Sequence, residues 1–406
     1  KKERINHLLA TEAKRGFDMK RIITPSEEEF PQTADVVVIG GGIVGTAAAF
    51  WLSKAGLDTV LVEMRSGLST LTTPNSVECY RKQFTEPAMS ALARESIDMF
   101  QVFPEVIGVP DFDIGLTEGG YLFYTDDPEK VPGLQEAVKT HHQLGVEDSE
   151  FLDRQDLLKR FPFLSESVQG GTFRQKDGWL SSHELTQGFA RGSQALFLVQ
   201  TKATDITVDN QGVTGVITSR GTIATRQIVN AAGPFAGVVG QMVGADLPVM
   251  PVRRQKAYIA PNDLIPQDAP MTIDLEREVY FRPETGGALI GWVDPEEPES
   301  PPSENLPIDR YFAAETISIL TETIPFWEQV AEGLKSTDII TSAGQYVYTP
   351  DDQPLIGEWV DVPGYYLNCG SWAGVMLAPA AGKRIAALIT AELAPEDNPL
   401  RPTRYA

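Results

Sequence analysis

The stretch DVVVIGGGIVGTAAAFWLSKAGLDTVLVE, residues 35–63, contains the pattern that decides the fold of this chain. Its apolar run Val36–Ile39 has the length and content of a buried parallel strand. Gly40, Gly42 and Gly45 follow with the spacing G-x-G-x-x-G, where a helical pattern begins. In such a turn the three glycines allow a tight bend, close approach of a pyrophosphate and close packing of the helix on the strand. The stretch therefore predicts a strand–turn–helix unit that binds a dinucleotide.

The residues after this turn extend the prediction. A helix is expected over residues 43–54, and the N–H groups of its first turn, at Ile43 and Val44, favour a phosphate. A second strand, Thr59–Val62, leads to Glu63, which lies about twenty residues after the first glycine, where a carboxylate accepts hydrogen bonds from a ribose. The alternative is a tight strand-to-helix turn without a ligand, but the second strand and the acid in register favour the nucleotide. The unit suits NAD and FAD equally.

Length and composition limit the other possibilities. The chain has 406 residues, of which 42% are hydrophobic, enough for two domains with cores of their own. No apolar run approaches the roughly eighteen residues of a membrane span. The net charge of −22 argues against nucleic acid and anionic membranes as partners, because phosphate binding needs concentrated Lys and Arg. The two cysteines, Cys79 and Cys369, favour reduced thiols and a cytoplasmic location, with targeting left open because the chain starts at Lys1.

Two later segments favour FAD over NAD. The segment IVNAAGPFA, residues 228–236, is a short apolar strand followed by small residues that permit close contact with a nucleotide. The segment TPDDQPLIG, residues 349–357, precedes a strand at 365–369, then Gly370, Gly374 and a helix over about residues 377–393. With this order of motifs, the chain from residue 35 to about 393 resembles the FAD-dependent D-amino-acid oxidase superfamily. It is most similar to the branch of sarcosine oxidase, glycine oxidase and dimethylglycine dehydrogenase.

The resemblance implies an α/β architecture (α+β overall) with two domains. A Rossmann-like FAD-binding domain is expected from three separated segments, residues 33–110, 180–250 and 338–406. A substrate domain, with a largely antiparallel sheet and helices, is expected from residues 111–179 and 251–337. Residues 1–32 are strongly charged and are expected to form an extension outside the core. Ligands of such folds bind between the domains, at the carboxyl ends of the strands.

The resemblance also implies catalytic residues. Arg81, in the loop TTPNSVECYRKQF at residues 72–84, matches an arginine that binds the substrate carboxylate, and a planar guanidinium suits that role because it forms two parallel hydrogen bonds. Its alternative partner is a protein acid or the flavin. Tyr280, by its spacing to Pro283, matches an active-site tyrosine, and Trp292 is expected beside it in an aromatic wall over the flavin. The alternative for both aromatic residues is a place in the core.

The chain departs from its relatives at three of the family's positions. Two of these positions, Tyr346 and Met376, complete the expected catalytic set. Tyr346 occupies the position of the cysteine that binds flavin covalently in monomeric sarcosine oxidase and of the substrate-binding arginine in glycine oxidase, so FAD is expected to be held non-covalently. Met376 stands where that oxidase has a lysine for the substrate carboxylate. Leu289 stands where it has an oxygen-activating lysine, so the electron acceptor is oxygen or, as in a dehydrogenase, a protein or quinone.

The residues expected to bind the cofactor come from all three FAD-domain segments. The helix that begins near Gly374 is expected to direct its N-terminus at the flavin, where backbone N–H groups stabilise the negative charge of the reduced ring. The complete expected set is Gly40, Gly42, Ile43, Val44, Gly45, Glu63, Met64, Arg65, Thr72, Thr73, Ala203, Ala231, Ala232, Gly233, Gly344, Gly370, Ala373, Gly374, Val375 and Met376.

The scarcity of histidine favours one reaction class. The chain has only four histidines, and oxidation of an alcohol generally uses such a base to take the hydroxyl proton. A neutral amine needs less help, because its lone pair expels the α-hydride to flavin N5 and the resulting imine is hydrolysed. We therefore expect FAD-dependent oxidation of a small secondary or N-methylated amino acid. The alternatives are a 2-hydroxy-acid dehydrogenase and a flavoprotein with an assembly role. The sequence shows no metal-binding cluster.

Overall fold

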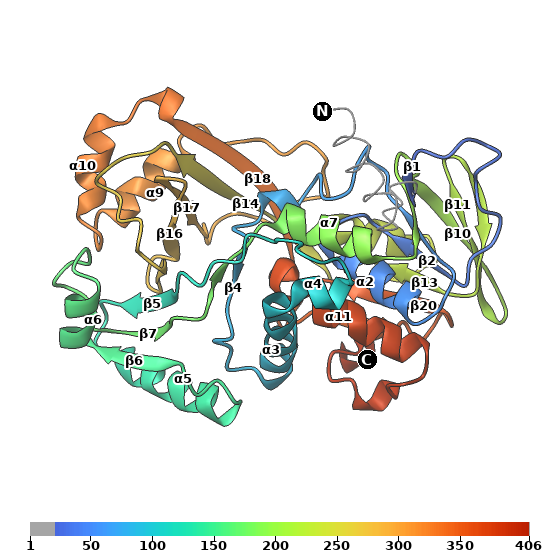
Figure 1. The fold of residues 1–406 in the computed structure, drawn as a ribbon, viewed down its shortest axis with the longest axis horizontal. Coiled ribbons are helices and arrows are strands. Elements are labelled where there is room, and N and C mark those ends of the chain that lie inside the picture. The colour runs from blue at the N-terminus through green and yellow to red at the C-terminus, as the bar shows by residue number, and fades with distance from the viewer. Residues whose placement is uncertain (1–20, 406) are drawn as a thin grey trace, which may run out of the picture.

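The computed structural model describes residues 21–405, which form two large sheets joined by extended segments (Figure 1). One sheet has seven strands. Of its six pairs of neighbouring strands, five are parallel and one is antiparallel. Its strands, in spatial order, are β1 (Ile22–Ile23), β9 (Leu196–Leu198), β3 (Thr59–Val62), β2 (Val36–Ile39), β13 (Ile228–Asn230), β20 (Tyr365–Cys369) and β19 (Leu355–Glu358).

The centre of this sheet is the strand–helix–strand unit expected from the sequence. All four residues of β2 and all four of β3 are buried, which explains their continuous apolar runs, because both faces of the sheet are covered. Between the two strands lies α2 (Ile43–Lys54). Gly45 packs so closely on the turn that a Cβ atom there would lie 2.0 Å from the carbonyl oxygen of Gly40. The small residue is therefore required for the helix to lie on the strand.

Different layers cover the two faces of the seven-stranded sheet. Helices pack on one face, where their apolar side chains join those of β2, β3 and β13 in one core. A three-stranded sheet and a short helix cover the other face with a second core. The helices of the first face are α2, α3 (Pro87–Gln101), α4 (Phe103–Ile107), α7 (Ser182–Gly192) and α11 (Gly374–Ile389); the second face carries β10 (Ala203–Asp209), β11 (Gly212–Thr218), β12 (Gly221–Ala224) and α8 (Ala236–Gln241).

The other large sheet has eight strands and is mainly antiparallel. In spatial order they are β18 (Ile339–Tyr348), β14 (Met250–Ile259), β17 (Gly287–Trp292), β16 (Val279–Glu284), β15 (Met271–Asp274), β5 (Tyr121–Thr125), β7 (Gly170–Arg174) and β6 (Glu150–Asp153). One face packs on α6 (Arg154–Arg160), α9 (Phe312–Leu320) and α10 (Phe326–Gly333). Another helix, α5 (Val131–Gln143), packs beside β6 and β7. A two-stranded ladder of β4 (Cys79–Tyr80) and β8 (Gly178–Trp179) lies at the junction with the seven-stranded sheet.

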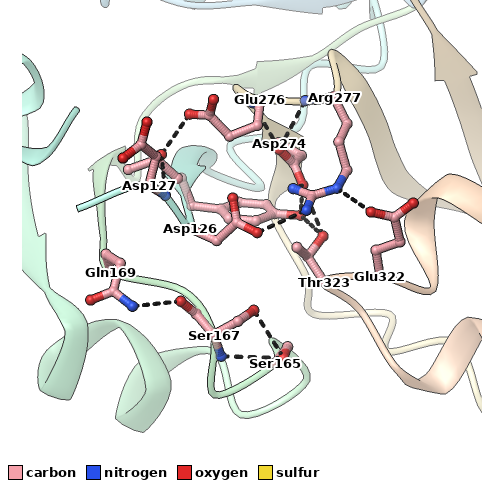
Figure 2. Close-up of polar contacts among 12 residues, drawn as sticks. Asp126, Asp127, Ser165, Ser167, Gln169, Asp274, Glu276, Arg277, Glu322 and Thr323 are labelled. Carbon is pink, nitrogen blue, oxygen red and sulfur yellow. Dashed lines mark hydrogen bonds and ion pairs between the residues drawn. The ribbon is translucent and has the colours of Figure 1, made fainter. Parts of the chain in front are cut away.

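An ion-pair cluster of Arg277, Asp126, Asp274 and Glu322 connects one end of the eight-stranded sheet to its helical layer (Figure 2). Arg277 forms ion pairs with Asp126 at 2.8 Å, Asp274 at 3.0 Å and Glu322 at 2.7 Å. Asp274 is buried, and it also accepts a hydrogen bond of 2.9 Å from Thr323. One guanidinium thus joins the end of β5, the β15–β16 turn and the segment after α9.

The structure departs from the expected segment boundaries in three places. Residues 22 and 23 were expected in an extension but form β1, which pairs with β9 as an edge strand of the seven-stranded sheet; residues 1–20 lie outside the described part. The segment 338–406 was expected on the FAD side, yet β18 pairs along its whole length with β14 of the eight-stranded sheet. The last long helix, α11, begins at Gly374, where an N-terminus directed at the flavin was expected, rather than near residue 377, and it ends at Ile389 rather than near residue 393.

Candidate active site

A deep cavity lies where the carboxyl ends of β2, β3, β13 and β20 face the eight-stranded sheet. The lining residues come from the glycine turn, the loop of residues 70–79, the segments after β13 and β20, and the end of β18. The first residues of α2 and of α11 both line this cavity, and both helices start without a side-chain cap. The cavity therefore offers two uncapped helix N-termini, which favour groups with negative charge.

Glu63 organises the glycine turn. Its carboxylate accepts a 2.6 Å hydrogen bond from the Gly41 N–H and a 2.7 Å hydrogen bond from the Arg65 N–H. The Ile43 N–H donates to the hydroxyl of Thr73 at 3.2 Å, so the loop of residues 70–79 is joined to the start of α2. Burial raises the pKa of Glu63, although these backbone donors oppose the shift. Contacts within the protein thus hold the turn in shape.

Arg81 lies in an aromatic wall beside the cavity. Its guanidinium carbon is 4.0 Å from the ring centroid of Phe84, 5.1 Å from that of Phe123 and 5.8 Å from that of Trp372. Desolvation lowers its pKa, and the nearby Tyr121 hydroxyl and Asp177 carboxylate oppose that shift.

Arg81 forms no ion pair with any of residues 21–405. Its charged neighbour Asp177 pairs instead with Arg174 at 2.5 Å. A half-buried cation without a carboxylate partner favours binding of an anion from outside the protein, because pairing compensates the cost of desolvation.

Tyrosines form much of the remaining wall. Tyr121 and Tyr346 line the cavity, and the pKa of each is raised above its ordinary value because both are desolvated. Tyr280 packs with Tyr121 and Cys79 in a small apolar cluster directly behind the lining. A Cβ atom on Gly291 would lie 2.2 Å from the Tyr280 hydroxyl, so this glycine leaves the space that the tyrosine occupies. The phenols of Tyr121 and Tyr346 are therefore neutral at neutral pH.

Most residues expected at the site do line the cavity. They are Gly40, Gly42, Ile43, Val44, Glu63, Met64, Arg65, Thr72, Thr73, Ala203, Ala231, Ala232, Gly233, Tyr346, Gly370, Ala373, Gly374, Val375 and Met376. Gly45 and Gly344 do not; Gly45 packs on the glycine turn, and Gly344 packs on Asn75 and Thr72 of the lining loop. Arg81 and Tyr280 form the layer behind the lining residues Trp372 and Tyr121.

Trp292 was expected in the aromatic wall, but it lies on the opposite face of the sheet. Its cross-strand neighbour is Val279, whereas Tyr280 pairs with Gly291. Because side chains alternate along a strand, Trp292 and Val279 share the face that packs against α9, where Trp292 borders a separate small hollow. The spacing pattern alone placed Tyr280 and Trp292 on one face; the register of β16 and β17 shows that they are on opposite faces.

Several lining residues were missed in the sequence. Trp372 directly follows Gly370 and Ser371, so its place in the turn at the expected cofactor site could have indicated that it lines the cavity. Tyr121 and Asn368 had no comparable signal, because an isolated aromatic or amide residue in a strand usually belongs to the core.

Comparison with known proteins identifies the family. Residues 35–388 match the model of the DAO family, described as FAD dependent oxidoreductase. The chain belongs to this family. FAD is accordingly its cofactor.

Three relatives illustrate the similarity. Mitochondrial dimethylglycine dehydrogenase of Rattus norvegicus is 26% identical over 94% of this chain and 46% of its own length. Human mitochondrial sarcosine dehydrogenase is 26% identical over 88% of this chain and 39% of its own length. The crystal structure of L-proline dehydrogenase from P. horikoshii superposes with a TM-score of 0.81 at 27% identity, covering 93% of this chain and 98% of the other. The chain thus spans less than half the length of the two mitochondrial relatives.

The residues of the cavity fit FAD. Two buried polar atoms without a partner, the Asn368 amide nitrogen and the Ser371 hydroxyl oxygen, belong to residues that line the cavity next to the α11 N-terminus. Such atoms are rare in folded proteins, and a bound group rich in acceptors would satisfy them. The glycine turn and Glu63 would hold the nucleotide half, while the start of α11 would hold the polar edge of the flavin. When bound, FAD supplies a hydride acceptor to the site.

No helix within residues 21–405 has the length and hydrophobicity needed to cross a membrane.

Proposed function

We propose that this protein oxidises the C–N bond of a small secondary or N-methylated amino acid. The observation that carries the proposal is Arg81, a cation in an aromatic wall that takes part in no ion pair of the described residues. A guanidinium in that setting suits a carboxylate, which it would orient through two parallel hydrogen bonds. The rings of Trp372 and Phe123 would exclude water from the same volume.

The ionisable groups of the cavity support an amine rather than an alcohol. Among residues 21–405, no histidine lines the cavity, and the two carboxylates that do are already engaged: Glu63 with backbone N–H groups, and Glu78 with the Ser182 hydroxyl at 2.6 Å. A hydroxy acid would need a base for its hydroxyl proton. A neutral amine needs no such base, since its lone pair assists departure of the hydride and water hydrolyses the imine. The names of the dimethylglycine, sarcosine and proline dehydrogenases also support an amine substrate.

We further propose a division of labour between the two sheets. The seven-stranded sheet and its covering layers would bind FAD, and the inner face of the eight-stranded sheet would bind the substrate. Leu289 stands where monomeric sarcosine oxidase has its oxygen-activating lysine, and this leucine is fully buried. Because the position carries no cation, we propose a protein or quinone as electron acceptor rather than fast reaction with oxygen.

Anaerobic mixing of the purified holoenzyme with a panel of compounds tests the proposal. Sarcosine, dimethylglycine and L-proline should bleach the visible band of the flavin, and the first two should release formaldehyde in aerobic or acceptor-coupled assays. Bleaching only by 2-hydroxy acids would replace the amine with an alcohol substrate. No bleaching by either class would favour an assembly role.

A further inference from the structure

The loop that lines the cavity is held from behind by two buried cations. Residues 72–79 contribute Thr72, Thr73, Ser76, Val77, Glu78 and Cys79 to the lining. Lys256 of β14 is only 2% exposed and donates to the carbonyl oxygens of Pro74 at 3.0 Å and Ser76 at 2.5 Å. Arg282 of β16 is 1% exposed and donates to the carbonyl oxygen of Val77 at 3.3 Å. Neither cation is itself part of the lining.

The backbone of this loop needs such support. Glu78 has a φ of +61°, a left-handed conformation that a glutamate rarely adopts. Its carboxylate accepts hydrogen bonds from the N–H and the hydroxyl of Ser182. The loop therefore depends on contacts from outside, and its wall would move if those contacts were lost.

The two cations differ in how their charge is compensated. Arg282 pairs with Glu284 and lies 3.9 Å from a Glu78 oxygen. Lys256 forms no ion pair with the described residues and has only the two loop carbonyls as hydrogen-bond acceptors. A buried ammonium is costly without a carboxylate, and a neutral side chain could fill the same space. A function that uses the charged donor explains why the site tolerates it.

We propose that Lys256 is a positioning residue, whose protonated amine holds residues 74–76 in the conformation that binds FAD. Lys256 acts in this role on the cofactor site alone, whichever substrate is oxidised. Together with Arg282, Lys256 links the eight-stranded sheet to the loop that lines the cavity.

The charge of Lys256 should change within an accessible pH range. Burial lowers its pKa to about 8, and Glu78 of the loop opposes this shift. The other charged or titratable groups near it are Arg282 and Glu284 of β16, Cys79 of β4, and Tyr258 of its own strand, whose ring centroid lies 5.0 Å from the Lys256 Nζ. Raising the pH from 7 to 9 should therefore neutralise most of the amine and weaken both hydrogen bonds to the loop.

Titration of the apoprotein with FAD at pH 7 and pH 9 tests this role. We expect the Kd of the wild type to rise at least fivefold over this range. Lys256→Arg keeps a charged donor at both pH values, so the Kd of this variant for FAD should change less than twofold between pH 7 and pH 9. Lys256→Met should bind FAD at least tenfold more weakly at pH 7 and lose the pH dependence. Lys383→Met, which removes an exposed lysine paired with Glu95, should behave as the wild type does.

A second measurement does not depend on any variant folding. Hydrogen exchange of the wild-type holoenzyme, corrected for the intrinsic effect of pH, should show loss of protection in residues 74–80 between pH 7 and pH 9. A wild-type Kd that is constant over this range, or a Lys256→Arg protein that keeps the wild-type pH dependence, would overturn the proposal. Unchanged protection of residues 74–80 would overturn it as well. Failure of every amine in the substrate panel would leave these results unaffected.

Discussion

The guanidinium carbon of Arg81 lies 4.0 Å from the centroid of the Phe84 ring, within the same loop. Stacking on the ring fixes the plane of the guanidinium, and one of its terminal nitrogens donates to the carbonyl oxygen of Gln83. Phe123 and Trp372 enclose the same group from two other segments. The cation is thus oriented by aromatic contacts and one backbone carbonyl oxygen rather than by a carboxylate.

Replacing Arg81 with lysine should weaken substrate binding. An ammonium keeps the charge but loses the planar pair of donors, so we expect a loss of about 2 kcal/mol, or roughly thirtyfold in substrate affinity. Anaerobic titration of the flavin spectrum with the active amine measures this directly. Arg160→Lys is a matched control, because Arg160 also stacks on a ring, that of Phe173 at 4.1 Å, but is exposed and is not among the lining residues. Equal affinity of the Arg81→Lys protein and the wild type would refute the carboxylate contact.

Substitution of Gly291 by alanine should disturb the aromatic wall. The new methyl group would meet the Tyr280 hydroxyl at 2.2 Å, so the tyrosine must move toward Tyr121 and Cys79. We expect a shifted visible spectrum of bound FAD, a changed KM, and a stability loss of about 1 to 3 kcal/mol. Gly333→Ala serves as control, because nothing lies within 4 Å of its Cβ position. A spectrum and KM identical to those of the wild type would show that Tyr280 is remote from the reaction.

Removal of Arg277 should destabilise the eight-stranded sheet. Arg277→Ala would leave the buried Asp274 without its cation (Figure 2), which we expect to reduce the free energy of unfolding by about 3 kcal/mol. Urea denaturation followed by circular dichroism measures the change. Arg226→Ala removes an exposed pair with Asp209, and its effect should stay below about 1 kcal/mol. Similar effects of the two substitutions would mean that the ion-pair cluster of Arg277 contributes no more to the free energy of unfolding than a surface ion pair does.

Protonation of His141 should destabilise the protein in mild acid. The side chain is buried and hydrogen-bonded to Ser149, and desolvation lowers its pKa from 6.5 to about 4. The unfolded chain therefore binds a proton between these two values while the folded chain does not, so this group's contribution to stability falls as the pH drops from 6.5 to 4. We expect it to lose on the order of 2 kcal/mol.

Comparison of variants isolates this contribution. The urea midpoint of the His141→Gln protein should depend less on pH between 7 and 5 than that of the wild type. His183→Asn, at an exposed position in the first turn of α7, should retain the full wild-type dependence. The same acid dependence in His141→Gln as in the wild type would assign the effect to other groups.

The local part of the fold was readable from the amino-acid sequence alone. β2, α2 and β3 begin and end where the pattern of residues 35–63 predicted, because strand length, the glycine spacing and the apolar runs are all set by neighbouring residues. The family motifs likewise placed most of the cavity lining. The strand–helix–strand unit requires only short-range geometry, whereas the lining, drawn from distant segments, was expected from the family resemblance.

The wall around Arg81 was decided by the tertiary structure. Phe123 reaches the arginine from β5, and Trp372 reaches it from the turn before α11, so no spacing in the sequence relates the three residues. Strand register also placed Trp292 on the face opposite Tyr280, although both strands had a similar aromatic pattern. Long-range pairing determines which face a side chain occupies, since a shift of one residue in register exchanges the two faces of a sheet.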